Sequence, residues 1–282
     1  MFSVFYNLFN KYARQLSFYV LILFLAFGSE ASNLLPIGAR SAAMGRTSVA
    51  MSGFWGIQNN QAGIALIDKY SFGINYESRF GLNELSTKSV AIIAPLNFGV
   101  IGLSFNHFGY SNYSEMKLGL AYARSFAKYF RIGIQLDYLS TSIGDNYGTK
   151  NSITFEIGIQ SDINDNITLG VYVFNPIMIR LADFNDEKLV SVIRFGIAYK
   201  FDKGLLVSLE AEKSSTLNPV LIRLGLEYSI KSKYFIRAGI ASRYEILCFG
   251  FGMKIKYFKF DIAATMHQYL GFSPQSSIIL NF

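Results

Sequence analysis

The sequence predicts an all-β protein, a transmembrane antiparallel β-barrel of about 14 strands with an N-terminal plug segment. Three observations predict this class. The 282 residues are 51% hydrophobic and only 16% charged, whereas a soluble domain carries about 25% charged residues. Bulky apolar side chains recur at every second position over most of the chain, which is the period of a β-strand. An apolar leader of the export type precedes this alternating region.

The first 31 residues predict a cleavable signal peptide. Lys11 and Arg14 precede the apolar run 16–27, and the small residues within 28–31 follow it. A run of this length is too short for a membrane-spanning helix, which needs about 20 residues. We therefore expect residues 1–31 to direct export.

Residues 32–69 do not alternate, and we predict that they form a plug or hatch segment for the barrel of residues 70–282. About fourteen strands enclose a lumen that their own inward side chains do not fill where these are Gly and Ala. A segment rich in small residues can enter that lumen without leaving many polar groups unpaired. The residues that we assign to this plug are Gly38, Arg40, Met44, Gly45, Asn60, Ala62 and Gly63.

Fourteen segments of residues 70–282 alternate between two kinds of face. Within 219–230, for example, one face carries Val, Ile and Leu, and the other carries Arg, Gly, Glu and Ser. A water-soluble sandwich alternates too, but a face of small residues and isolated charges of both signs is typical of a barrel lumen. The predicted strands are 70–80, 85–94, 98–109, 114–126, 130–142, 150–162, 167–175, 188–201, 205–213, 219–230, 234–242, 245–255, 258–267 and 276–282.

The connections between these strands predict two different ends. If the first strand starts in the periplasm, the inward connections are short and the outward ones mostly longer, as in outer-membrane barrels. The longest outward connection is 176–187, and we expect its apolar residues to contact a partner. These residues are Ile177, Met178, Ile179 and Leu181.

The inward end collects lysines, among them Lys231 and Lys233, which we also assign to partner contact. Two interpretations remain open, because both depend on the same attraction of opposite charges. The lysines bind either the headgroups of anionic lipids or an acidic periplasmic protein.

Residues that carry chemistry are few. A single cysteine, Cys248, excludes a disulfide framework, and His107 and His267 lie in no catalytic or metal-binding motif. The basic residues are scattered, unlike a nucleic-acid-binding face. We predict a protein that is not an enzyme, with no cofactor, no metal and no nucleic-acid partner. The charges on the inward face are expected to form a mixed ion-pair network.

Two motifs carry a resemblance to a known family. The stretch 38–45 reads Gly-Ala-Arg-Ser-Ala-Ala-Met-Gly, and Asn60-Gln61-Ala62-Gly63-Ile64 precedes the first strand. Both resemble motifs of the FadL-like outer-membrane family, and within it the PorV/PorQ group of Bacteroidota. The second motif departs from the group's pattern, because Gln61 stands where the group has proline, so the turn is expected to be less rigid.

The resemblance implies the outer membrane of a Gram-negative bacterium of the Bacteroidota, and it implies one of two functions. PorV/PorQ-like members are protein-binding or structural subunits of envelope secretion or assembly complexes, related to type IX secretion. We expect this role first, with outer-membrane lipid and other envelope proteins of a hetero-complex as partners. The alternative is a FadL-like channel for the uptake of hydrophobic small molecules.

Overall fold

The computed structural model describes residues 35–127, 129–144, 148–178, 189–216, 220–242 and 245–282. The chain divides into two units, residues 1–33 and residues 34–282, and only the second is described. The predicted signal peptide of residues 1–31 lies outside the described residues.

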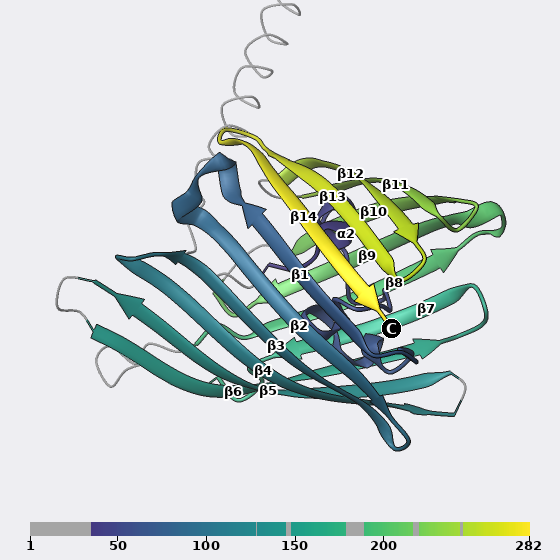
Figure 1. The fold of residues 1–282 in the computed structure, drawn as a ribbon, viewed down its shortest axis with the longest axis horizontal. Helices are drawn as coiled ribbons and strands as arrows, with labels where there is room; N and C mark the ends of the chain where they lie inside the picture. Colours follow the sequence, from purple (N-terminus) through teal and green to yellow (C-terminus); the bar gives the residue numbers. More distant parts are fainter. Residues whose placement is uncertain (1–34, 128, 145–147, 179–188, 217–219, 243–244) are drawn as a thin grey trace, which may run out of the picture. The chain divides into compact units, whose positions relative to one another are not determined.

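The described chain forms one closed antiparallel barrel of fourteen strands, which confirms the predicted fold class (Figure 1). Each strand pairs with its neighbour in sequence, and β1 pairs with β14 to close the cylinder. The strands are β1 Ser71–Ser78, β2 Ser86–Leu96, β3 Gly99–Tyr110, β4 Tyr113–Phe126, β5 Phe130–Ile143, β6 Gly148–Asp162, β7 Ile167–Phe174, β8 Val192–Lys200, β9 Leu205–Ser214, β10 Leu221–Ile230, β11 Tyr234–Ala241, β12 Glu245–Ile255, β13 Phe258–His267 and β14 Gly271–Asn281.

The alternation of the sequence becomes the two faces of the wall. In β1, Phe72, Ile74 and Tyr76 are exposed on the outside, whereas Ser71 and Asn75 are buried. The same pattern continues around the cylinder and gives it an apolar outer surface and a polar inner surface. An apolar outside with a polar inside is the arrangement that suits a barrel to lipid.

The two ends of the cylinder are named here by what lies at them. The terminus end holds Ser71, which pairs with Asn281, and the hairpin turns that follow the even-numbered strands. The loop end holds the opposite connections, which include the short helices η2 Arg79–Gly81 and η3 Asn83–Leu85. A further short helix, η4 Asp202–Gly204, forms the β8–β9 turn at the terminus end.

Two predicted strand starts were wrong by more than two residues. β8 starts at Val192 instead of 188, and β14 starts at Gly271 instead of 276. Pro274 and its polar neighbours indicate a loop in the sequence. In the structure Pro274 pairs with Ala264 of β13, while pairing of β14 with β1 ends at Gln275. The missing amide proton of Pro274 therefore costs no ladder hydrogen bond on the β1 side.

Among the described residues, no helix is both long and apolar enough to cross a membrane.

Candidate functional site

Residues 35–67 form a compact inner segment that is packed against the inner face of the wall. It contains two short helices, α2 Ala39–Ala43 and α3 Gly56–Asn59, and the single turn η1 Gln61–Ile64. Gly38 and Gly45 flank α2 with φ angles of 104° and 65°, a backbone conformation that glycine adopts without strain. A Cβ atom on Gly45 would also lie 2.6 Å from the carbonyl oxygen of Ile240 in β11. Both glycines are thus required by the path of the segment.

Glycines of the wall give the inner segment its space. At nine glycines of the described wall, each on a different strand, an added Cβ atom would meet an atom of the segment. On Gly225, for example, it would lie 2.5 Å from the carbonyl oxygen of Met44. The nine are Gly73, Gly102, Gly133, Gly158, Gly170, Gly196, Gly225, Gly239 and Gly250. The segment and the wall therefore approach each other at backbone distance around much of the circumference.

Apolar contacts also hold the inner segment against the wall. Phe54, Trp55 and Ile57 are buried against small or branched residues of the wall. Phe54 and Trp55 also meet edge to face, with ring centroids 5.0 Å apart, an arrangement that aromatic pairs prefer. The wall residues of this cluster are Ala91, Ile93, Val100, Ala121, Ala123 and Ile279.

Arg40 of α2 forms the first charged link between segment and wall. Its Nε and Nη2 atoms donate to the two carboxylate oxygens of Glu227 at 2.8 and 2.7 Å. Glu227 also accepts from Arg237 at 2.6 Å, and Arg237 donates to Asp261 at 2.7 Å. Burial alone would lower the pKa of Arg40, but the carboxylates of Glu227 and Asp261 outweigh it and raise that pKa above its usual value. Arg40 therefore stays charged.

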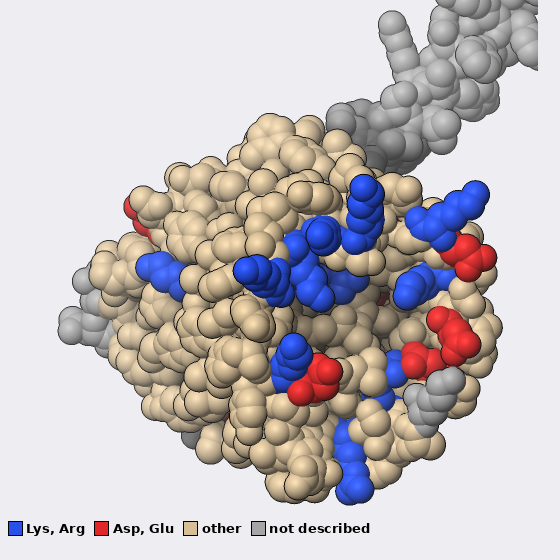
Figure 2. All heavy atoms as spheres, turned by 45° about the vertical axis from the view of Figure 1, so that its right-hand side comes forward, with Lys and Arg blue, Asp and Glu red and all other residues tan. Residues whose placement is uncertain are grey.

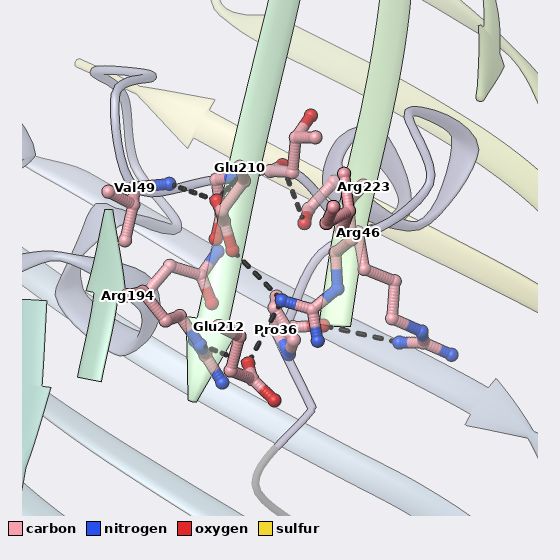
Figure 3. Close-up of polar contacts among 12 residues, drawn as sticks. Pro36, Arg46, Val49, Arg194, Glu210, Glu212 and Arg223 are labelled. Atoms are coloured by element: carbon pink, nitrogen blue, oxygen red, sulfur yellow. Dashed lines mark hydrogen bonds and ion pairs between the residues drawn. The ribbon is translucent and has the colours of Figure 1, made fainter. Parts of the chain in front are cut away.

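Glu210 of β9 forms a second link, to the backbone of the inner segment (Figure 3). One carboxylate oxygen accepts from the amides of Ser48 and Val49 at 2.7 and 2.9 Å. The other accepts from Arg223 at 2.9 Å. Glu212 joins Arg223 to Arg194 with contacts of 2.9 and 2.6 Å. These pairs confirm the expected ion-pair network of the lumen.

Arg46 forms a third link, and it is almost completely enclosed. Its guanidinium pairs with Glu77 of β1, and each side chain is only 1% exposed. The same guanidinium donates to the carbonyl oxygen of Pro36 at 3.2 Å. The pair thus ties two turns of the segment to the first strand.

The Asn60–Gly63 motif forms a fourth link. The Asn60 amide group donates to the carbonyl oxygen of Val49 at 2.7 Å, and its oxygen caps η1 by accepting from the amide of Ala62. Gln61, which stands in place of the expected proline, donates to Glu156 of β6. Lys117 of β4 pairs with the same carboxylate. Gln61 therefore adds a contact to the wall that proline could not make.

The structure brings all the residues assigned to the plug to this one region, but their role in closing the barrel stays a prediction. Met44, Ala62 and Gly63 are buried within the inner segment. Of the residues assigned to partner contact, Ile177 and Met178 are exposed at the loop end. Lys231 and Lys233 are exposed at the terminus end, and Ile179 and Leu181 lie outside the described residues.

One cavity beside the inner segment is small. A cavity of about 50 Å³ lies between Arg40, Ser52 and Trp55 of the segment and Lys259 and Asp261 of the wall. A cavity that holds benzene measures about 150 Å³. This space therefore admits water but no aromatic molecule.

No family model and no curated protein matches the chain. Several solved structures match its fold. A mutant of the monoaromatic hydrocarbon channel TodX has a TM-score of 0.71 at 11% identity, with 89% of this chain and 100% of that chain covered. The toluene transporter TbuX of Ralstonia pickettii has a TM-score of 0.65 at 14% identity, with 88% and 98% covered. A FadL homologue of Pseudomonas aeruginosa has a TM-score of 0.60 at 12% identity, with 86% and 96% covered.

These likenesses show a shared fold, that of FadL-like barrels. Two of the three matched structures are described as a monoaromatic hydrocarbon channel and a toluene transporter. The PorV/PorQ part of the resemblance has no counterpart among them and stays a prediction.

Sequence reasoning missed the residues of the wall that hold the inner segment. Glu77 and Lys117 were not assigned to any site, and Glu156 was expected only as a member of the ion-pair network of the lumen, although each lies on an alternating strand. Their position on the inward face was a usable signal. The sequence carries no comparable signal for their partners in the inner segment, because irregular backbone has no periodicity that predicts contacts.

Proposed function

We propose that the protein is an outer-membrane channel of a Gram-negative bacterium that takes up hydrophobic small molecules. The observation that carries the proposal is the fourteen-stranded barrel with a segment packed inside it, which matches the fold of two channels described as acting on monoaromatic hydrocarbons or toluene. The apolar outer surface supports the membrane location.

The lumen offers an apolar surface next to the inner segment. Val49 packs there against Tyr172 and Phe174 of β7 and Val192 of β8, all of them buried. A hydrophobic molecule that displaced Val49 would meet these side chains in place of water, which favours its entry. Because the cavity beside Arg40 is only about 50 Å³, passage at that point requires the segment to shift.

A disulfide that fixes the segment to the wall tests this proposal. The Cβ atom of Ala50 lies 3.5 Å from the position of a Cβ atom on Gly196 of β8, and disulfides join Cβ atoms about 3.5–4.5 Å apart. We would introduce Ala50→Cys with Gly196→Cys, in a background where Cys248→Ala removes the native thiol. Uptake of radiolabelled toluene is then measured in Gram-negative cells that express the barrel.

The reduced double variant should take up toluene faster than cells without the barrel, and oxidation should abolish this gain. Each single-cysteine variant should be indifferent to oxidation. Uptake that never exceeds the empty cells would overturn the channel function. Equal uptake by the oxidised and reduced forms would show that molecules pass without movement of the segment.

A second candidate is the role expected first from the sequence, a protein-binding or structural subunit of a PorV/PorQ-like, type IX related complex. The comparisons favour the channel over this role. The observation that favours a protein-binding role is the pair of exposed apolar side chains, Ile177 and Met178, at the loop end. Stoichiometric envelope proteins that co-purify in mild detergent, and are lost when both residues are changed to Ser, would support it.

A further inference from the structure

Lysines gather at the terminus end of the barrel. Figure 2, which brings the right-hand side of Figure 1 forward, shows Lys and Arg side chains around a hollow, with fewer Asp and Glu side chains among them. Three successive turns at this end contribute, those of β8–β9, β10–β11 and β12–β13. Their exposed lysines are Lys200, Lys203, Lys231, Lys233, Lys254 and Lys256, which we call the rim lysines.

Among the residues that the structure describes, the rim lysines have no carboxylate partners. Within the described part of the chain, none of the six forms an ion pair, whereas the arginines on the inner wall of β8, β10 and β11 all do. Asp202 lies in the β8–β9 turn and offsets the charge only in part. The rim therefore presents a net positive charge to whatever enters the mouth.

Two rim lysines are in direct register with each other and with a third lysine. The amide of Lys254 donates to the carbonyl oxygen of Lys233 at 2.8 Å, and Lys254 is the cross-strand partner of Lys259. Directly opposed side chains of a sheet lie about 5 Å apart, where like charges destabilise it. Lys259 is eased by Asp261 at 3.8 Å and by the ring of Phe235 at 5.4 Å. Lys233 and Lys254 have no such contact with a carboxylate or a ring among the described residues.

The side of the wall that carries these lysines decides whether they contact lipid or a molecule in the mouth of the barrel. Lys254 and Lys259 continue the inward register of Gly252 and Asp261. The outward positions beside them hold Tyr234 and Phe258, which are 44% and 43% exposed. Rings at such outward positions suit the lipid interface. Lys254 and Lys259 therefore face the mouth of the barrel and not the lipid.

The width of the rim indicates the size of the partner. From β8 to β13 there are five spacings between neighbouring strands, which is about 24 Å along the wall. An extended chain covers that distance with about seven residues. A single small anion would contact only one part of such an arc.

We propose that the rim lysines form a docking surface for an acidic segment of another polypeptide, which binds at the mouth of the terminus end. In the orientation expected from the sequence this mouth faces the periplasm. This binding does not depend on transport, so the docking proposal is tested independently of the channel function. Acidic residues of the partner would remove the repulsion between Lys233, Lys254 and Lys259 that the isolated barrel retains.

Binding of a model peptide tests the proposal. The full barrel, in nanodiscs of neutral phosphatidylcholine, is titrated against fluorescein-labelled deca-glutamate and, as a control, deca-glutamine, and anisotropy is recorded. Deca-glutamate should bind and deca-glutamine should not, and added salt should weaken the binding of deca-glutamate. The variant Lys233→Glu with Lys254→Glu should raise the Kd by about tenfold or more.

The matched control is Lys88→Glu with Lys150→Glu, which makes the same change of charge at exposed lysines outside the rim. It should leave the Kd within about twofold of the wild type. Migration on unheated gels confirms that both variants are folded barrels. Equal weakening by the two variants would overturn the rim as the binding surface.

Two further outcomes would also overturn the proposal. Competition by inorganic phosphate at the same concentration of charge would assign the rim to a small anion. Failure to bind deca-glutamate, combined with a preference for phosphatidylglycerol nanodiscs that the Lys233→Glu, Lys254→Glu variant loses, would assign it to lipid headgroups.

Discussion

The charged residues of the inner wall and the rim lysines stand on the same strands but differ in their partners. Arg237, Arg223 and Arg194 are at most 3% exposed, and each is paired with a carboxylate. The rim lysines lie further along the wall, at the terminus end, where they are exposed and form no ion pair with a described residue. Burial makes an unpaired charge very costly, whereas water removes most of that cost at the rim. Pairing in the interior is therefore a condition of folding, and its absence at the rim leaves charge available for binding.

The largest expected effect is at Glu227, which serves two arginines. Glu227→Gln leaves Arg40 and Arg237 without their shared carboxylate, so the free energy of unfolding should fall by about 3–5 kcal/mol. Urea unfolding in lipid vesicles, followed by the fluorescence of the single tryptophan Trp55, measures it. Glu84→Gln, at an exposed loop-end carboxylate, is the control and should change little. Similar losses at both positions would break the contrast between interior and surface.

A smaller effect is expected at the pair of Arg46 and Glu77. Arg46→Met leaves the Glu77 carboxylate buried without its partner and should cost about 2–3 kcal/mol. The double variant Arg46→Met with Glu77→Leu should recover most of this loss, because no charge is then left buried. Trypsin cleavage after Arg40, followed by mass spectrometry, gives a second measure of how firmly the inner segment is held. No recovery in the double variant would mean that the pair does more than satisfy its own charges.

The smallest effect, and one of opposite sign, is expected at the rim. Lys254→Gln removes the repulsion with Lys233 and Lys259, so it should raise the free energy of unfolding by about 0.2–1 kcal/mol at low salt. The gain should disappear near 1 M salt, where the screening length is about 3 Å. Lys150→Gln is the control, because Lys150 lies opposite Thr141 and not opposite a lysine. A loss of stability in Lys254→Gln would show that the rim lysines have carboxylate partners after all.

The fold was predictable because a strand alternates with a period that the sequence displays directly. Twelve of the fourteen strands begin and end within two residues of the prediction. β14 begins five residues earlier than expected. A strand tolerates Pro274 only where its nitrogen faces no ladder partner, and this depends on how β14 aligns with β1 and β13, which the sequence does not display. The site was predictable only in outline. Gln61 shows why: it was expected to loosen a turn, but its amide reaches Glu156, 95 residues away in the sequence.

The ring of wall glycines has a consequence for how the protein matures. Glycine has no side chain to fill the space beside a strand. At nine positions of the wall, residues 35–67 fill that space instead. If β1 and β14 paired before residues 35–67 entered the lumen, the closed barrel would contain a water-filled cavity. A barrel that wraps around these residues expels that water during closure. The seam is therefore expected to be the last part of the molecule to form, with the inner segment serving as the template on which the strands are laid down.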